Sequence, residues 1–305
     1  MSPTSDIGLS MGLDIGATKT LGVVIDDAGR ILAEVREATE PGTAGVIGTA
    51  ARVVEALRAA TGEPLTGPVG VGIPGLVDHE QGAVKHAVNL RLDGDWFALG
   101  ERLGERLGVS VVVENDVNAA TLGAVEMSGE DDLVYLSIGT GLAAGLVLEG
   151  RLRRGDHGAA GEVGHIPVDP GGVLCECGQR GCLETIASGS ALAAAWPATG
   201  EAPPAQSLFA AAQSGDPKAI EVRDEFASGI ASAIRVLALA VDPRTVVLGG
   251  GVAQLGEQLR AVVAASLLAQ AEASPFLASL DLAGRLRVVP SDYPVAAVGA
   301  ALLGR

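Results

Sequence analysis

Short apolar runs alternate with stretches of helical periodicity along most of the chain. Such alternation is typical of an α/β protein, in which helices cover a sheet. In the first half we expect helices at residues 43–61 and 97–107 and strands at residues 9–14, 19–26, 31–36, 68–73 and 110–114. In the second half we expect strands at residues 245–248 and 286–290 and helices at residues 183–196, 216–240, from 252 and after 294. Residues 202–206, rich in Pro and Ala, are expected to form an exposed connector.

The opening of the chain recurs in its second half. Residues 13–18 align without a gap on residues 136–141, and the match continues with Gly22 on Gly145. Each segment then turns at a glycine followed by an arginine. Chance similarity between two glycine-bearing strands is the alternative explanation. Because the glycines and the apolar phase both match, we favour an internal duplication of a β-hairpin, and two such hairpins facing one another would form a cleft.

All three cysteines lie within eight residues, at Cys175, Cys177 and Cys182, and His165 comes ten residues before the first of them. One imidazole and three thiolates are a complete tetrahedral set for Zn²⁺, so such a metal would be structural. The alternative is three buried apolar cysteines. Their clustering favours zinc, although the Cys-x-Cys spacing is tighter than usual. The metal would leave two neighbouring carboxylates free to bind a substrate, Glu162 and Glu184.

Three glycine turns are candidates for binding phosphate. The first follows Asp14, and a carboxylate beside backbone N–H groups, a hydroxyl and an ammonium suits a magnesium-bound polyphosphate. None matches the P-loop or dinucleotide pattern, and each alone could be an ordinary turn. Together they favour a nucleotide cleft. The turns contain Gly16, Thr18 and Lys19; then Gly139, Thr140 and Gly141; and finally Gly249, Gly250 and Gly251.

The expected strand at residues 110–114 closes with polar residues: Glu114, Asn115 and Asp116, followed by Asn118. Ligands of α/β proteins bind at such strand ends, where an Asp can accept a proton from a hydroxyl and an Asn can bind neighbouring oxygens. Helix capping explains the same residues equally well. Gly75 and Asn89 have weaker claims to a site, since turns alone explain them.

Length, composition and charge limit the class of protein. A chain of 305 residues favours about two domains. The net charge of −16 argues against nucleic acid or an anionic membrane as the main partner. The start carries no basic region followed by an apolar run, and the apolar stretch at residues 234–241 is too short to span a membrane. We therefore expect a cytoplasmic protein.

Taken together, these residues resemble the ROK family (repressors, uncharacterised open reading frames and kinases). The resemblance covers nearly the whole chain, and its motifs are Asp14-x-Gly16-x-Thr18-Lys19, Gly72-Ile73-Pro74-Gly75, Glu114-Asn115-Asp116-x-Asn118, Ile138-Gly139-Thr140-Gly141, Gly161-Glu162-x-Gly164-His165, the cysteine cluster through Glu184, and the late glycine triplet. It implies the two-domain α/β fold of the actin-like (ribonuclease H-like) sugar kinases, with a nucleotide and sugar cleft between the domains. Residues 1–117 with 293–305 would form the N-terminal domain, and residues 118–292 the C-terminal domain with the zinc site.

The same resemblance implies an ATP-dependent kinase for the 6-hydroxyl of a hexose. Asp116 would be the base, Mg²⁺ with ATP would act near Asp14, and the glycine turns would bind the nucleotide. His165 would serve both zinc and sugar. The sugar-binding residues would be Gly75, Asn89, Asn115, Asp116, Glu162, His165 and Glu184.

Several alternatives remain open. Glucose is the favoured hexose, ahead of mannose, fructose or an N-acetylhexosamine. Polyphosphate is a less favoured donor than ATP, because relatives that use it generally lack this cysteine cluster. Ala17 departs from the family, which often has Gly there, and its methyl group would crowd the phosphate and lower the affinity for nucleotide. A sugar-responsive repressor is the rival function, but such members carry a helix-turn-helix domain ahead of the first motif, where this sequence leaves no room. We also expect a homodimer or a dimer of dimers.

Overall fold

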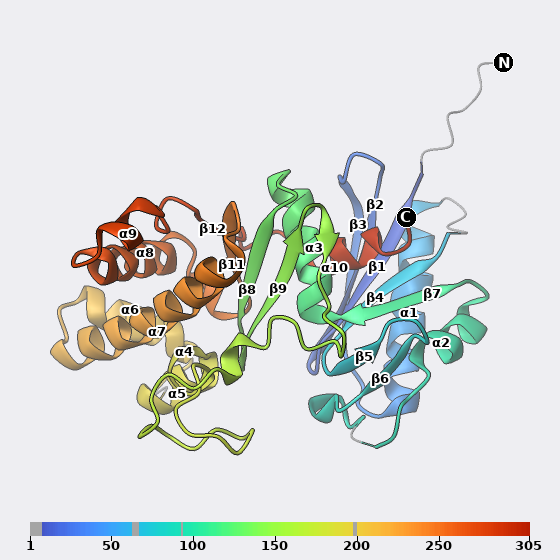
Figure 1. The fold of residues 1–305 in the computed structure, drawn as a ribbon. Helices are drawn as coiled ribbons and strands as arrows, with labels where there is room; N and C mark the ends of the chain where they lie inside the picture. The colour runs from blue at the N-terminus through green and yellow to red at the C-terminus, as the bar shows by residue number, and fades with distance from the viewer. Residues whose placement is uncertain (1–7, 63–66, 93, 198–199) are drawn as a thin grey trace. The chain divides into compact units, whose positions relative to one another are not determined.

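The apolar runs of the first half form one five-stranded sheet and those of the second half form another, each within its own α/β unit (Figure 1). The structure is a computed structural model that describes residues 8–62, 67–92, 94–197 and 200–305. Unit 1 consists of Met1–Gly129, Arg154–Gly158 and Pro294–Arg305, and unit 2 of Glu130–Arg153 and Ala159–Tyr293. Each unit has its own hydrophobic core.

The sheet of unit 1 has the strand order β3-β2-β1-β4-β7. Strands β1, β2 and β3 form an antiparallel meander, whereas β4 and β7 run parallel to β1. The carboxyl ends of β1, β4 and β7 therefore meet at one edge of the sheet, where Asp14 and Asn115 lie. A separate hairpin, β5 and β6, follows β4. The strands are β1 (Ser10–Ile15), β2 (Lys19–Ile25), β3 (Ile31–Ala38), β4 (Val69–Ile73), β5 (Leu76–Asp78), β6 (Ala83–Lys85) and β7 (Val111–Asn115).

Helices cover both faces of this sheet. Helix α1 (Thr43–Thr61) packs on β2 and β3, with α2 (Leu99–Leu107) beside it. Helices α3 (Asp116–Ser128) and α10 (Val295–Leu302) cover the opposite face. Gly12 and Gly70 allow α10 to lie directly on β1 and β4, because a Cβ atom at either position would overlap the backbone of that helix. The C-terminal residues thus complete the core of unit 1.

The sheet of unit 2 has the order β10-β9-β8-β11-β12. Its strands are β8 (Leu133–Ile138), β9 (Leu142–Leu148), β10 (Arg151–Leu152), β11 (Thr245–Gly249) and β12 (Leu286–Val288). Helix α7, capped by Asp216, contributes much of the core, and α4, α6 and α8 pack against it. The helices are α4 (Glu184–Ala187), α5 (Gly189–Ala195), α6 (Pro204–Gln213), α7 (Pro217–Val241), α8 (Glu257–Ala271) and α9 (Pro275–Ser279).

The two sheets share one topology, which supports the predicted duplication. In each, a three-stranded meander is followed by two parallel strands in the same order. The predicted gap-free alignment is wrong by one residue after the turn. Leu13 pairs with Gly22 in the first hairpin, whereas the equivalent Leu136 pairs with Ala144 and not with Gly145. The second turn is therefore one residue shorter than the first.

Three further predictions need correction. The predicted helix at residues 183–196 is two helices, because Ser188 is extended and its hydroxyl caps α5. The predicted connector at residues 202–206 contains the start of α6, since Pro204 suits the first helical turn. The predicted domain boundary after residue 117 falls inside α3, which packs against β4 and β7, so unit 1 continues to Gly129.

No helix among the described residues is both long and apolar enough to cross a membrane.

Candidate active site and metal centre

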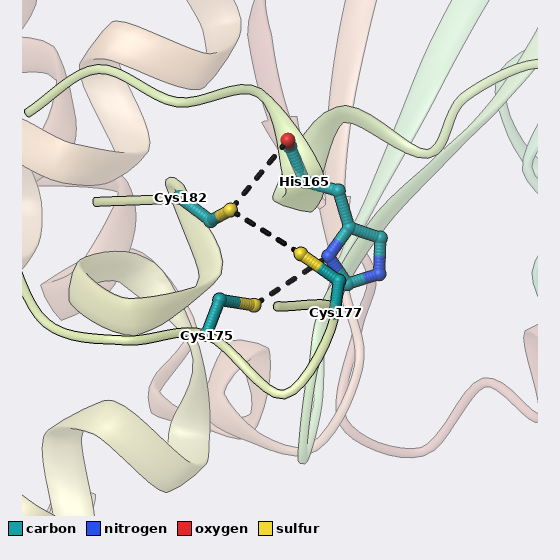
Figure 2. A group of neighbouring side chains, drawn as sticks. All are labelled: His165, Cys175, Cys177 and Cys182. Carbon is teal, nitrogen blue, oxygen red and sulfur yellow. Dashed lines mark hydrogen bonds between the residues drawn. The ribbon is translucent and has the colours of Figure 1, made fainter. Parts of the chain in front are cut away.

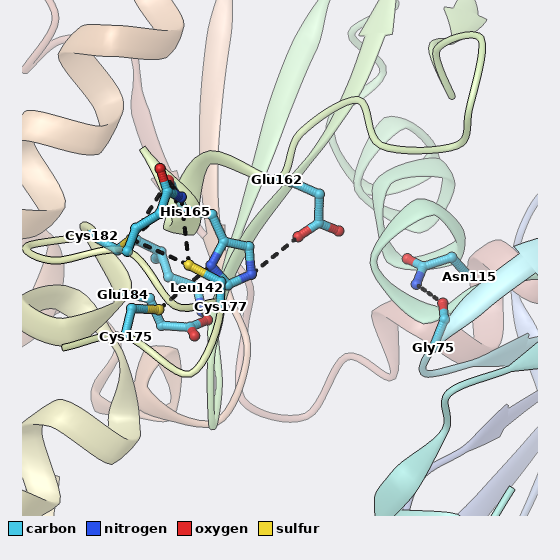
Figure 3. Close-up of polar contacts among 10 residues, drawn as sticks. Gly75, Asn115, Leu142, Glu162, His165, Cys175, Cys177, Cys182 and Glu184 are labelled. Carbon is cyan, nitrogen blue, oxygen red and sulfur yellow. Dashed lines mark hydrogen bonds and ion pairs between the residues drawn. The ribbon is translucent and has the colours of Figure 1, made fainter. Parts of the chain in front are cut away.

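The junction between β7 and α3 carries the polar residues at the sheet edge of unit 1. Asn115 caps α3: its Oδ1 accepts hydrogen bonds from the N–H groups of Val117 at 2.9 Å and Asn118 at 3.2 Å. Its Nδ2 donates to the carbonyl oxygen of Gly75 at 3.1 Å (Figure 3). Helix capping is therefore a real role of Asn115, and the same side chain ties the loop after β4 to this junction.

Gly75 owes its place to its backbone conformation. It has a φ of +105°, and a Cβ atom there would lie 2.7 Å from the carbonyl oxygen of Lys85. Only glycine fits such a position without strain. Asn89, the other predicted loop residue, lies exposed in the 3-10 helix Val88–Leu90. The structure thus brings Gly75 to Asn115 and leaves Asn89 at the surface.

Two carboxylates influence one another at this edge. Asp14 is at the end of β1, and Asp116 is the first residue of α3, where its Oδ1 accepts from the N–H of Val117 at 3.0 Å. The pKa of Asp14 is raised to about 7: burial is the largest cause, the negative charge of Asp116 adds to it, and Lys19 opposes the shift. A cation near Asp14 would relieve this repulsion, which is the electrostatic setting that a metal-bound polyphosphate favours.

The predicted metal ligands of unit 2 converge (Figure 2). The ligand atoms of His165, Cys175, Cys177 and Cys182 all lie within 4.8 Å of one another. Cys175 Sγ lies 3.7 Å from His165 Nδ1, and Cys177 Sγ lies 3.6 Å from Cys182 Sγ. Zn–S bonds of about 2.3 Å in a tetrahedron place two sulfurs about 3.8 Å apart. The donor set and its dimensions therefore fit a zinc ion.

The thiols of this cluster would not all ionise by themselves. Hydrogen bonds from Gln179 lower the pKa of Cys177 to about 6. Burial, with the neighbouring thiols adding to it, raises the pKa of Cys182 to about 12. A divalent cation supplies the positive charge that makes such a thiol a thiolate. The sequence did not single out Gln179, whose Nε2 also donates to the carbonyl oxygen of His165 at 3.1 Å.

His165 links this cluster to a carboxylate. Its Nδ1 faces Cys175, whereas its Nε2 lies 3.9 Å from Glu162 Oε2 (Figure 3). Both side chains are partly exposed. Glu184 begins α4, and its Oε2 accepts from the N–H of Leu142 at 2.9 Å. The structure thus gathers Glu162, His165 and Glu184 around the start of β9.

Three glycines make this arrangement possible. A Cβ atom at Gly161 would overlap the carbonyl oxygen of Ala144, and one at Gly164 would overlap that of Leu142. A Cβ atom at Gly141 would overlap Glu184 Oε2. The segments that carry Glu162 and Glu184 therefore lie directly against the start of β9.

The glycine turns of unit 2 also come together. The carbonyl oxygen of Gly139 accepts from the N–H of Gly189 at 2.7 Å, which places the start of α5 on this turn. Gly250 has a φ of +84°, and a Cβ atom there would lie 2.6 Å from the carbonyl oxygen of Ile138. Gly139, Thr140 and Gly141 therefore lie beside Gly249, Gly250 and Gly251.

The N–H groups of Gly16 and Gly139 close their own turns. Gly16 donates to the carbonyl oxygen of Lys19 at 2.9 Å, and Gly139 donates to that of Gly141 at 3.0 Å. These two amides are therefore engaged, and phosphate would have to use other groups of the turns. Thr18 and Lys19 are exposed in the first turn, and Thr140 is exposed in the second.

The sequence analysis missed one partner of the β7–α3 junction. Arg154 Nε donates to Glu114 Oε2 at 2.6 Å, and the Glu114 side chain is only 3% exposed. A charged residue at the end of an apolar strand is a signal that a partner exists. Nothing in the sequence identifies a partner 40 residues away.

Comparisons with known proteins agree with this geometry. The model of the ROK family matches residues 10–301. A glucokinase of Streptomyces coelicolor is 34% identical over 274 residues, which is 82% of this chain and 84% of the relative. An N-acetylmannosamine kinase of Yersinia pseudotuberculosis is 32% identical over 261 residues, or 85% of this chain and 88% of the relative.

A solved structure gives the same result. The crystal structure of a ROK family glucokinase from Streptomyces griseus, in complex with glucose and AMPPNP, matches with a TM-score of 0.79 and 32% identity. The match covers 98% of this chain and 99% of that one. The fold is therefore the actin-like two-domain α/β fold. With the family match over nearly the whole length, the chain belongs to the ROK family.

Proposed function

We propose that this protein is an ATP-dependent sugar kinase that transfers the γ-phosphoryl group of ATP to the 6-hydroxyl of a hexose, with glucose as the favoured substrate. One observation carries the proposal. In a chain that aligns over nearly its whole length with a glucokinase, Asp116 lies at a sheet edge close enough to Asp14 to raise its pKa. A base for a hydroxyl and a carboxylate for a cation are what this reaction needs.

In the proposed mechanism Asp116 takes the proton of the 6-hydroxyl as that oxygen attacks the γ-phosphorus, and the bond from the γ-phosphorus to the bridging oxygen breaks to release ADP. The N–H of Val117 holds one oxygen of Asp116, which leaves the carboxylate with a fixed orientation. Asp14 would hold Mg²⁺ through water, and Mg²⁺ would neutralise charge on the phosphates. Lys19, Thr18 and the two glycine turns of unit 2 would bind the nucleotide.

In unit 1, Asn115 and Gly75 would contact hydroxyls near the reacting oxygen. Asn89, exposed in its loop, would be a further contact. In unit 2, Glu162, Glu184 and His165 Nε2 would bind the hydroxyls at the far end of the ring. Because His165 Nδ1 faces the sulfurs, one imidazole can serve both metal and sugar.

We propose structural zinc for the cluster of His165 and the three cysteines. Four protein ligands leave no position for a reactive water, so the ion would orient its neighbours and take no part in phosphoryl transfer. The zinc would hold the loop that leads into Glu184 and the imidazole that faces Glu162. Zinc content can be measured by atomic emission on purified protein, and we expect one ion per chain.

A coupled assay of ADP release tests the proposed activity. The panel is glucose, mannose, fructose, N-acetylmannosamine and N-acetylglucosamine, each with ATP. Because polyphosphate yields no ADP, the same sugars with inorganic polyphosphate are assayed for the sugar 6-phosphate instead. We expect the highest kcat/KM with glucose and ATP. A higher value with N-acetylmannosamine would assign the substrate of the Yersinia relative instead. If no sugar supports ADP release, while a hexose alters binding to duplex DNA, the protein is a regulator.

We also propose that the protein is a homodimer, the commonest assembly of soluble oligomers. Light scattering during gel filtration gives the mass in solution. A monomeric mass at the concentrations used in the assay would exclude the homodimer.

A further inference from the structure

The chain returns to unit 1 for five residues between two segments of unit 2. Strand β10 ends at Leu152 in unit 2, Arg154–Gly158 belongs to unit 1, and unit 2 resumes at Ala159. In this five-residue segment Arg154 forms an ion pair with Glu114, in which its Nε donates to Glu114 Oε2 at 2.6 Å. The partner lies on β7, which belongs to the same unit.

The chemistry of Glu114 makes this contact strong. Its side chain is 3% exposed, and a buried carboxylate is costly unless it is paired and hydrogen-bonded. Its Oε2 is bound by Arg154, while its Oε1 accepts from the backbone N–H of Asn115 and from Asn118 Nδ2, both at 2.9 Å. Both oxygens are thus used, and Arg154 contributes the only formal positive charge among these three partners.

These hydrogen bonds fix residues on both sides of Asp116 in the sequence. Glu114 holds the residue before Asp116 through its backbone and the residue two positions after it through its side chain. Asn118 is itself buried, and its N–H is bound by the Asn115 cap. The direction in which Asp116 leaves the backbone therefore depends on the Glu114 carboxylate staying in place.

We propose that Arg154 is a positioning residue for the phosphoryl transfer, an inference that rests on the proposed function. Arg154 neutralises Glu114, and Glu114 fixes the turn from β7 into α3 that aims Asn115 and Asp116 at the substrate. Arg154 itself touches no substrate in this account. An ordinary surface ion pair would add little to stability and nothing to turnover.

The adjacent arginine provides a matched control. Arg153 also pairs with a glutamate, Glu149, at 3.2 Å, but the two side chains are 41% and 86% exposed. Arg153 has the same charge as Arg154 and lies next to it in the chain. Its partner Glu149 is far in sequence from the junction of β7 with α3. Arg153→Met should therefore leave kcat within about twofold of the wild type.

The test compares kcat and KM for five proteins in the ADP-release assay: wild type, Arg153→Met, Arg154→Met, Arg154→Lys and Arg154→Met combined with Glu114→Gln. We expect Arg154→Met to lower kcat by about 10- to 100-fold, because misplacement of a reacting group by about 1 Å can cost about 100-fold, while the KM for ATP changes less than threefold. Arg154→Lys should recover part of the loss. The double variant should exceed Arg154→Met several-fold, because glutamine keeps an acceptor for Asn115 and Asn118 and removes the unpaired charge.

The outcomes separate two kinds of failure. If wild type releases no ADP with any sugar, the proposed function is wrong and this inference is wrong with it. If wild type is active and Arg154→Met has the kcat of Arg153→Met, the inference alone is wrong. An equal loss in Arg154→Met and the double variant would also overturn it. Circular dichroism melts exclude unfolding as the cause, and Arg154→Lys replaces Arg154→Met in each comparison if the latter does not fold.

Discussion

Unit 1 and unit 2 each carry carboxylates proposed to act on the sugar, and they hold them by different physical means. In unit 1, hydrogen bonds and the ion pair of buried Glu114 with Arg154 fix the turn that carries Asp116. In unit 2, Glu162 and Glu184 lie beside a cluster of thiols and an imidazole, and glycines let their segments contact β9 closely.

The difference matches the two proposed tasks. A base has to change its protonation state during the reaction, so it needs surroundings of charge and hydrogen bonds that stay in place as it does so. A binding surface needs only a fixed shape, and a metal cluster with tight backbone contacts provides one. Changes at Asp116 should therefore affect chemistry first, and changes at the metal-held segment of unit 2 should affect hexose binding first.

The largest expected effect is on turnover and comes from unit 1. Asp116→Asn keeps the shape of the side chain and much of its hydrogen bonding but cannot accept a proton, so kcat should fall by about 10²–10⁴-fold. The affinity for hexose should change far less. Steady-state ADP release measures the first quantity, and near-normal turnover would show that another group is the base.

The second prediction concerns pH and Asp14. Its pKa is raised from an ordinary value of 3.8 to about 7 by burial and by Asp116, so the folded protein retains a proton that the unfolded chain releases between these values. Ionisation of Asp14 therefore lowers the free energy of unfolding. The full loss applies above about pH 7, and there is no loss below the pKa of the unfolded chain. Without metal or nucleotide, Asp14→Asn should be more stable than wild type by about 2–4 kcal/mol at pH 8 and no more stable at pH 4.

Denaturant unfolding at the two pH values checks this. Exposed Asp95 provides the control, because Asp95→Asn removes an equal charge from a solvated position of the same unit. Equal stabilities of Asp14→Asn and wild type at pH 8 would mean that burial and Asp116 do not raise the pKa of Asp14 as described.

The third prediction tests the metal cluster of unit 2. Cys177→Ser should lose the zinc, and hexose affinity should fall by about 10–100-fold, because Glu184 and His165 would no longer be held. The control is Glu176→Gln, a change at an exposed neighbour whose side chain is not one of the four converging ligands. Zinc content and calorimetric titration with hexose are measured together, and zinc-free protein with full affinity would refute the role.

The smallest effect is expected at Gly141. A methyl group there would displace Glu184 Oε2 from its hydrogen bond with Leu142, so Gly141→Ala should raise the KM for hexose by about 3- to 10-fold. Gly139→Ala, in the same turn, places its Cβ where no atom lies within 4 Å and should leave this KM near the wild-type value. If both variants raise it equally, Glu184 is not held as proposed.

The comparison of units also explains what the sequence could predict. The metal cluster was predicted because its ligands are chemically distinctive and lie within one short stretch, from His165 to Cys182. The hairpin that opens each sheet was also predicted, because its apolar pattern and its glycine turn recur in both halves of the chain. The pairing of Arg154 with Glu114 could not be predicted, because it depends on where a distant loop returns.

Smaller errors have equally local causes. The register of β8 with β9 depends on a turn one residue shorter than its counterpart, and sequence similarity of the strands does not report turn length. The break at Ser188 was missed because the surrounding apolar residues continue the helical pattern, whereas the serine hydroxyl starts a new helix.

Calorimetric titration of hexose into Asp116→Asn and Cys177→Ser tests the central claim most directly, namely that Asp116 provides the base and the metal-held segment of unit 2 provides much of the affinity for hexose. The account predicts that Asp116→Asn, although nearly inactive, binds hexose within a few-fold of the wild-type Kd, whereas Cys177→Ser binds at least about 10-fold more weakly. The opposite pattern, with affinity lost in Asp116→Asn and kept in Cys177→Ser, would contradict it.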